Sequence, residues 1–160
     1  MHALDENWRD FLTALERHDV QYMLIGGIAL GVHGHVRYTK DLDVWFHGTL
    51  SNAERLIAAL RDFGFTDISA APDAFCTPRA MLVLGNEPGA IELLNFADGV
   101  EFEACWPQRL VVPLDGVEVT VIGLDDLRQN KRATGRLQDL ADLEQLDAGS
   151  HRNNKEGNEK

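Results

Sequence analysis

The segment DLDVWF, residues 41–46, constrains the fold most, because polar and apolar side chains alternate along it with a period of two. That period is typical of a β-strand, in which Leu42 and Val44 point into a core while Asp41 and Asp43 leave the opposite face together. Two neighbouring carboxylates repel each other, and a divalent cation such as Mg²⁺ between them removes the repulsion. The segment therefore predicts a sheet that carries a candidate metal pair. The alternative is a solvated edge strand with ordinary surface acids.

A glycine pair precedes this strand. Gly26-Gly27 ends the short apolar run 21–25 and comes directly before a predicted helix over residues 28–34. Glycines at such a junction let backbone N–H groups approach a phosphate, and the amino end of a helix favours an anion. The alternative is a simple turn. Arg37 and Thr39, followed by Lys40, place hydrogen-bond donors and positive charge beside the two acids.

A third acid, Glu92, lies in the strand-like segment AIELLNF, residues 90–96. Ile91 and Leu93 alternate with it, so Glu92 projects away from the core side of that strand. A charged residue within an apolar strand needs a compensating partner if it is buried. If this strand lies next to residues 41–46, Glu92 completes a cluster of three carboxylates. The alternative is an acid on an exposed sheet face.

The remaining pattern alternates helices and strands, which indicates an α/β or α+β fold with a mixed β-sheet and flanking helices. We expect one domain over residues 1–147 and a disordered polar tail over residues 148–160. Ser51 and Glu54 have the spacing of a capping box, and Asp115-Gly116 predicts a hairpin turn. The other expected elements are helices over 4–17, 51–63 and 124–147, the last interrupted at Gly135, and strands over 80–84 and in both halves of 109–122.

Composition excludes several classes of function. The formal net charge of −11 argues against sequence-blind binding of duplex DNA, which needs a broad basic face. No window approaches the ~18 unbroken apolar residues of a membrane span, and the first residues lack the basic and apolar regions of a signal peptide. The two cysteines, Cys76 and Cys105, form neither a zinc pattern nor a disulfide framework. We therefore expect a cytoplasmic protein with free thiols and no membrane partner.

The glycine pair, the short helix, the Asp-x-Asp pair and the later strand acid together resemble the nucleotidyltransferase superfamily, which shares its fold with DNA polymerase β. The stretches YMLIGG, HGHVRYTKDLDVWF, IELLNFADGVEFEACW and LDDLRQNKRATGRLQDLADLEQL are similar to small stand-alone bacterial members. The likeness covers about residues 20–147. It implies that Gly26 and Gly27 hold the phosphates of a nucleoside triphosphate, with Arg37 and Thr39 also contacting the nucleotide.

The same resemblance implies that Asp41, Asp43 and Glu92 bind two Mg²⁺ ions, or Mn²⁺ in their place. Asp is more usual than Glu at the third position. It also implies that a basic helix faces the site, so we expect Lys131 in the segment NKRATGR to touch a donor phosphate. Arg136 in that segment is a further cation. Asp139 and Asp142 follow it and could form ion pairs with these cations on the helix surface. Asp139 could instead orient Lys131 or Arg136. The alternative is a solvated helix face.

The implied reaction transfers a nucleoside monophosphate to an acceptor hydroxyl and releases pyrophosphate. The acceptor is an RNA end, a protein side chain or a small molecule. Some relatives act in toxin–antitoxin or abortive-infection systems, which implies a small helical partner protein. Two other hypotheses stay open. One is a non-catalytic binding module of the same fold, antitoxin-like or regulatory. The other is an acidic α/β domain whose Asp-x-Asp motif is surface only.

Overall fold

A mixed six-stranded sheet in the order β3-β4-β2-β1-β6-β5 forms the centre of the chain. The computed structural model describes residues 4–66, 68 and 71–158. Strands β1 and β2 are antiparallel, as are β3 with β4 and β5 with β6, whereas β2 pairs with β4 and β1 with β6 in parallel. The strands are β1 (Tyr22–Ile25), β2 (Asp41–Phe46), β3 (Met81–Leu84), β4 (Ala90–Leu94), β5 (Leu110–Leu114) and β6 (Val117–Val121).

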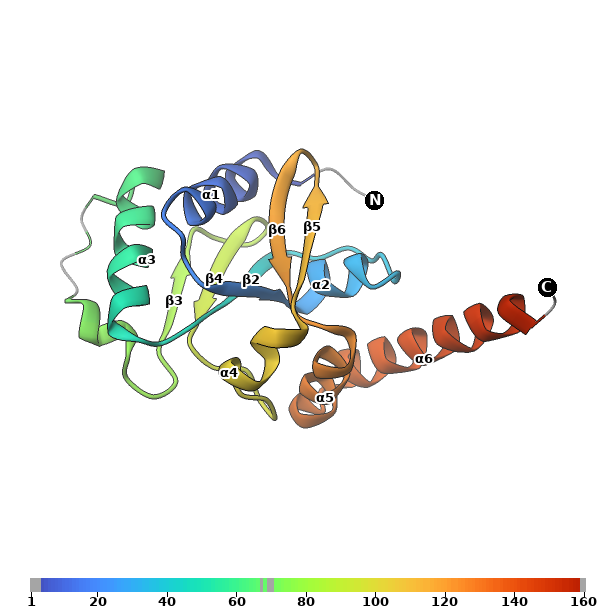
Figure 1. Cartoon of the computed structure of the whole chain (residues 1–160). Helices are drawn as coiled ribbons and strands as arrows, with labels where there is room; N and C mark the ends of the chain where they lie inside the picture. Colours follow the sequence, from blue (N-terminus) through green and yellow to red (C-terminus); the bar gives the residue numbers. More distant parts are fainter. Residues whose placement is uncertain (1–3, 67, 69–70, 159–160) are drawn as a thin grey trace.

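Helices flank the sheet, and Figure 1 shows α1 and α3 beside the strands while α5 and α6 lie toward the C-terminal end. The α+β architecture predicted from the sequence is confirmed. The edge-to-face rings of Phe11 and Phe63 join α1 to α3. The helical segments are α1 (Glu6–Arg17), α2 (Gly26–Val32), α3 (Leu50–Phe63), η1 (Pro72–Phe75), α4 (Phe102–Cys105), η2 (Trp106–Gln108), α5 (Leu124–Thr134) and α6 (Leu137–Asn158).

The two faces of β2 have different surroundings. Leu42, Val44 and Phe46 are buried in the hydrophobic core, as their period-two spacing predicts. On the opposite face Trp45 is covered by the ring of Phe102 in α4, at a centroid distance of 5.2 Å. Asp41 and Asp43 lie on that second face but are only half-buried. The core therefore fixes the strand and leaves its acidic end accessible.

Several boundaries differ from the sequence-based expectations. Helix α3 begins at Leu50 and is capped by Thr49, whose hydroxyl accepts a hydrogen bond from the Asn52 N–H at 3.4 Å. The capping box expected at Ser51 is therefore wrong, because Ser51 already lies inside the first turn. The glycine pair forms the first turn of α2 instead of preceding it. The hairpin turn at Asp115-Gly116 is confirmed, with φ values of 49° and 80°.

Helix α6 runs from Leu137 to Asn158 and projects away from the sheet (Figure 1). The helix extends past residue 147 into the segment 148–160, for which composition predicts disorder. The disorder of that segment and the end of the domain at residue 147 stay predictions. Among the described helices, none has the length and apolar character needed to cross a membrane. Both cysteines are free thiols.

Candidate active site

The three predicted acids meet at one end of the sheet. Strands β2 and β4 run parallel, and their register places Asp43 directly opposite Glu92. Side chains at paired positions leave the same face, so these two carboxyls are neighbours, with Asp41 two residues earlier on the same face. The structure therefore brings together the residues that the sequence singles out, because β4 lies next to β2.

A fourth acid was not found from the sequence. The Asp41 carboxyl lies within hydrogen-bonding reach of Glu87, as the Asp43 carboxyl does of Glu92. Glu87 belongs to the turn between β3 and β4, a place that neither periodicity nor motif spacing marks. We refer to Asp41, Asp43, Glu87 and Glu92 as the acid cluster.

The acid cluster carries more negative charge than its surroundings neutralise. Burial raises the pKa of Asp43, and the adjacent Glu92 raises it further. Burial and Glu87 likewise raise the pKa of Asp41. The Oδ1 atom of Asp41 is buried and makes no hydrogen bond within the described part of the chain. Each of these carboxylates would be stabilised by an added cation.

The donor chemistry fits a hard divalent cation, which prefers carboxylate oxygens, and the unpaired Oδ1 of Asp41 offers such a ligand. The four acids instead contact one another in pairs. Over the described residues, no group of three or more His, Cys, Asp or Glu side chains has the arrangement of a preformed metal site. The residues are thus suitable in kind and close in space, and their side chains would have to reorient around a bound ion.

The glycine pair lies against the acid cluster. Gly26 has a φ of 71°, and a Cβ atom at this position would collide with the carboxylate of Asp43. A Cβ atom at Gly27 would lie 2.7 Å from the Cβ and Oγ1 atoms of Thr39. Both positions therefore require glycine, because the start of α2 passes directly beside β2 and the segment before it. This close approach puts the amino end of α2 next to Asp43.

The Thr39 side chain packs against the start of α2 and against the first residue of β2. Its hydroxyl donates to the Asp41 carbonyl at 3.0 Å, which links the segment before β2 to the strand itself. Its contact with the start of α2 is consistent with the predicted position at a nucleotide, and the nucleotide contact itself stays a prediction.

Arg37 and Lys131 form ion pairs with buried carboxylates. Arg37 makes two 3.0 Å hydrogen bonds to the carboxylate of Asp142 in α6. Lys131 is 3% exposed, and its Nζ donates to Asp142 at 2.9 Å and lies 3.5 Å from Asp139. The predicted phosphate contacts of both residues stay predictions. In the structure both side chains contact Asp142. We refer to Arg37, Lys131, Arg136, Asp139 and Asp142 as the ion-pair cluster.

Arg136 is the member of this cluster that also acts on the acids. Its Nε donates to Asp139 at 2.9 Å, while 77% of its side chain is exposed. Asp139 raises the pKa of Arg136, and the charges of Asp43 and Glu92 raise it further. Gly135, in the left-handed conformation, ends α5 and reverses the chain at this point. From the sequence, the phosphate contact is assigned to Lys131 and not to Arg136, because the chain reversal, which leaves Lys131 buried and Arg136 exposed, has no local signal that separates the two cations.

Comparison with known proteins supports the fold. No protein-family model matches the chain, and no curated protein matches it in sequence. Among solved structures, it is similar to the crystal structure of a "putative nucleotidyltransferase" from Thermotoga maritima. The TM-score is 0.60 at 14% identity, over 90% of this chain and 95% of that one. The chain therefore has a nucleotidyltransferase-like fold.

Proposed function

We propose that the protein is a Mg²⁺-dependent nucleotidyltransferase. The observation that carries this proposal is the close approach of the glycine pair to the acids, which puts the amino end of a helix beside Asp43 and Glu92. Helix amino ends favour phosphate, and paired acids favour divalent cations. The similarity in fold to a protein described as a nucleotidyltransferase supports the same assignment.

In this proposal the acceptor hydroxyl oxygen forms a bond to the α-phosphorus of a nucleoside triphosphate. The bond from that phosphorus to the bridging oxygen breaks, and pyrophosphate leaves with the electron pair. The hydroxyl proton passes to a carboxylate of the Asp43–Glu92 pair. Asp41, Asp43 and Glu92 would hold two Mg²⁺ ions, or Mn²⁺ in their place, which when bound neutralise charge on the phosphates.

The polypeptide supplies position and charge. Backbone N–H groups at Gly26 and Gly27 would bind donor phosphates at the amino end of α2. Arg136 is exposed and interacts electrostatically with Asp43 and Glu92, so it would contact the donor or the leaving pyrophosphate. This role takes the place of the one expected of Lys131, which is buried between Asp139 and Asp142.

The acceptor in this proposal is an RNA end, a protein side chain or a small molecule. The net charge of −11 favours the latter two, because it repels the phosphates of an RNA chain. We extend the proposal to a cytoplasmic protein that works with a small helical partner in a toxin–antitoxin or abortive-infection setting.

Thermal unfolding with each of the four nucleoside triphosphates, with and without Mg²⁺, tests the site. At 100 times its Kd a ligand stabilises a protein by about 2.7 kcal/mol, which corresponds to a rise of roughly 5–10 °C for a chain of this size. We expect that rise with at least one triphosphate in the presence of Mg²⁺. Asp43→Asn should abolish the rise and lower pyrophosphate release at least about 100-fold, since a ligating carboxylate matters at least as much as the groups that orient it.

Glu54→Gln is the matched control, because Glu54 is an exposed acid on α3, outside the acid cluster. This variant should behave as the wild type in both assays. A rise of equal size in Asp43→Asn, or no rise with any triphosphate, would count against the enzyme. The second result would favour a binding module whose partner is recognised without nucleotide.

A further inference from the structure

A largely apolar cavity of about 470 Å³ lies beside the proposed phosphate site. Its wall includes Gly27, the second glycine of the pair, and Thr39, which contacts that glycine. Pro88, which follows Glu87 in the chain, also lines the wall. The cavity therefore borders Gly27 and the segments that directly precede β2 and β4, next to the strands that carry the acids. Its volume falls within the roughly 300–1,000 Å³ of small-molecule sites.

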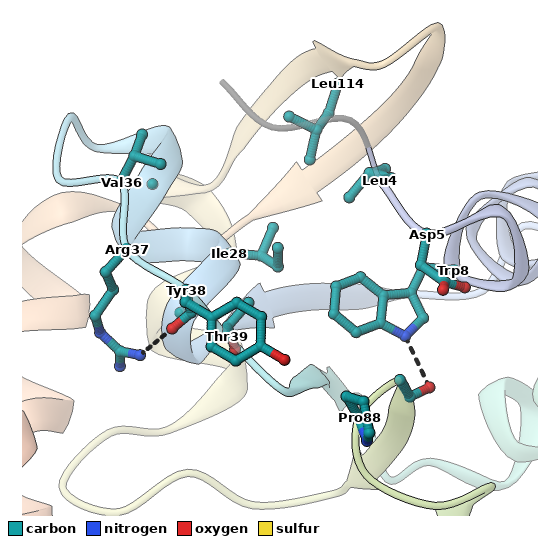
Figure 2. Close-up of a pocket in the computed structure, with 13 residues that line it drawn as sticks. Leu4, Asp5, Trp8, Ile28, Val36, Arg37, Tyr38, Thr39, Pro88 and Leu114 are labelled. Carbon is teal, nitrogen blue, oxygen red and sulfur yellow. Dashed lines mark hydrogen bonds between the residues drawn. The ribbon is translucent and has the colours of Figure 1, made fainter.

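Two aromatic rings and a helix of small residues shape this cavity. Figure 2 shows the Tyr38 ring and the Trp8 indole facing each other across the cavity, with Pro88 below them and Ile28 above in this view. Trp8 is 6% exposed, whereas Tyr38 is 70% exposed. One wall is the α2 surface formed by positions 27, 28 and 31, of which two are glycines. Flat walls of this kind suit a planar ring better than a branched group.

Several polar groups of the wall already make hydrogen bonds or ion pairs. Trp8 Nε1 donates to the Gly89 carbonyl at 3.0 Å, and Thr39 Oγ1 donates to the Asp41 carbonyl. The Arg37 guanidinium, which also borders the cavity, is neutralised by Asp142. Asp5 adds a carboxylate at the rim. A phosphate would thus be disfavoured inside the cavity, whereas an uncharged ring would bury apolar surface there.

From this arrangement we infer that the cavity binds the nucleobase of the donor nucleotide, stacked against Tyr38 and Trp8. The inference rests on the proposed function, since the phosphates of the same nucleotide lie at Gly26 and Gly27. Gly27 belongs to both places, and this arrangement matches the layout of a nucleotide, with an uncharged ring in the apolar cavity and charged phosphates at the helix end.

Gly31 offers a way to fill the cavity without disturbing the fold. It lies within α2 and borders the cavity, and a Cβ atom there would meet only an ordinary contact, 3.9 Å from Val36. Gly31→Leu therefore occupies the cavity and should weaken binding of the nucleoside triphosphate about tenfold or more, as loss of base stacking does. Gly149→Leu is the matched control, because Gly149 lies in helix α6 with open space around it.

Inorganic tripolyphosphate with Mg²⁺ separates the two parts of the site. Calorimetric titration should give Gly31→Leu the same Kd for tripolyphosphate as the wild type, while its Kd for the triphosphate rises. Tyr38→Ala should raise the Kd for the triphosphate about fivefold to tenfold, and Tyr38→Phe should restore it because the ring is kept. Because Tyr38 is exposed, neither change should alter the unfolding midpoint.

The base assignment is overturned if Gly31→Leu binds the triphosphate as tightly as the wild type. It is also overturned if only the KM of the acceptor rises in that variant, since the cavity would then hold the acceptor. If the wild type binds neither tripolyphosphate nor any triphosphate in the presence of Mg²⁺, the proposed function fails and the base assignment fails with it. The wild-type titration thus distinguishes the two failures.

Discussion

The acid cluster and the ion-pair cluster both gather carboxylates, but only the ion-pair cluster includes cationic side chains that are hydrogen-bonded to them. In the ion-pair cluster, Asp139 and Asp142 receive hydrogen bonds from Lys131 and from two arginines. In the acid cluster, carboxyl meets carboxyl, at Asp43 with Glu92 and at Asp41 with Glu87. The first arrangement is neutralised by hydrogen-bonded cations, whereas in the second burial and the mutual repulsion of the acids outweigh the nearby charges of Lys40 and Arg136.

The pKa shifts have opposite signs in the two clusters. Burial alone would raise the pKa of every carboxyl. Hydrogen bonds from Thr134 and Arg136 outweigh burial at Asp139, and those from Arg37, Lys131 and Gln138 outweigh it at Asp142, so both pKa values fall below the ordinary value. Burial and neighbouring acids act together at Asp41 and Asp43, so their pKa values rise. The comparison teaches that the sign of the shift separates carboxylates that hold the fold from those available to a ligand.

The largest expected effect comes from breaking the neutralised cluster. Lys131→Met leaves Asp139 and Asp142 without their shared ammonium group in a buried place. Removing one partner of a buried ion pair typically costs about 3–5 kcal/mol. We expect the free energy of unfolding to fall by that amount in a urea titration. Arg132→Met should cost less than about 0.5 kcal/mol, because Arg132 is the next residue of the same helix and is exposed.

Equal losses in Lys131→Met and Arg132→Met would show that the buried pairing contributes nothing to the fold. A folded Lys131→Met protein that no longer binds tripolyphosphate would instead restore the phosphate contact that the sequence predicts for Lys131. The two measurements together decide which role this lysine has.

A smaller effect is expected at the residue that joins the two clusters. Arg136→Gln removes a charge that is bonded to Asp139 on one side and faces Asp43 and Glu92 on the other. We expect the rate of pyrophosphate release to fall about tenfold, within the range of added Lys or Arg contacts to phosphate charge. Unfolding should change by less than about 1 kcal/mol, because the side chain is largely exposed.

Arg136→Lys keeps the charge but loses the planar guanidinium, so it should recover part of the rate. If Arg136→Gln loses stability and keeps its full rate, Arg136 belongs only to the ion-pair cluster and the acid cluster has another cation.

The contrast also shows which parts of the site were predictable from the sequence. Asp41, Asp43 and Gly26 could be predicted because their signals are local: a period of two along one strand, and glycines where a strand turns into a helix. Glu92 required the further assumption that β4 lies next to β2, which the register confirms. Most helices and strands were predictable for the same reason, since each follows from its own periodicity.

Asp139 and Asp142 are candidate partners of the nearby cations from the sequence, but the burial of Lys131 between them was not predictable. Its position between Asp139 and Asp142 depends on the reversal of the chain at Gly135, and Arg37 reaches Asp142 across 105 residues. A basic helix segment does not reveal which of its cations is buried. The prediction of the α3 cap was wrong for a more local reason. Thr49 and Ser51 are both good capping residues, and only the path of the preceding loop selects Thr49.

The smallest expected effect is the acid sensitivity of the ion-pair cluster. Burial alone would raise the pKa of Asp142, but hydrogen bonds from Arg37, Lys131 and Gln138 lower it below the ordinary value. A carboxyl with a lowered pKa in the folded state stabilises the protein above its unfolded-state pKa, near 4. That stabilisation is lost as the pH falls toward the folded-state pKa. Between pH 5 and pH 3.5 it should lose up to about 0.7 kcal/mol.

Urea titrations at the two pH values measure this loss in the wild type and in Asp142→Asn. The variant is less stable at both values, because its amide cannot neutralise Arg37 and Lys131, but its stability should change less with pH. Glu54→Gln should keep the pH dependence of the wild type, since Glu54 is exposed and outside both clusters. An unchanged pH dependence in Asp142→Asn would mean that Asp142 has the same pKa folded and unfolded, and the contrast in sign between the clusters would not hold at this residue.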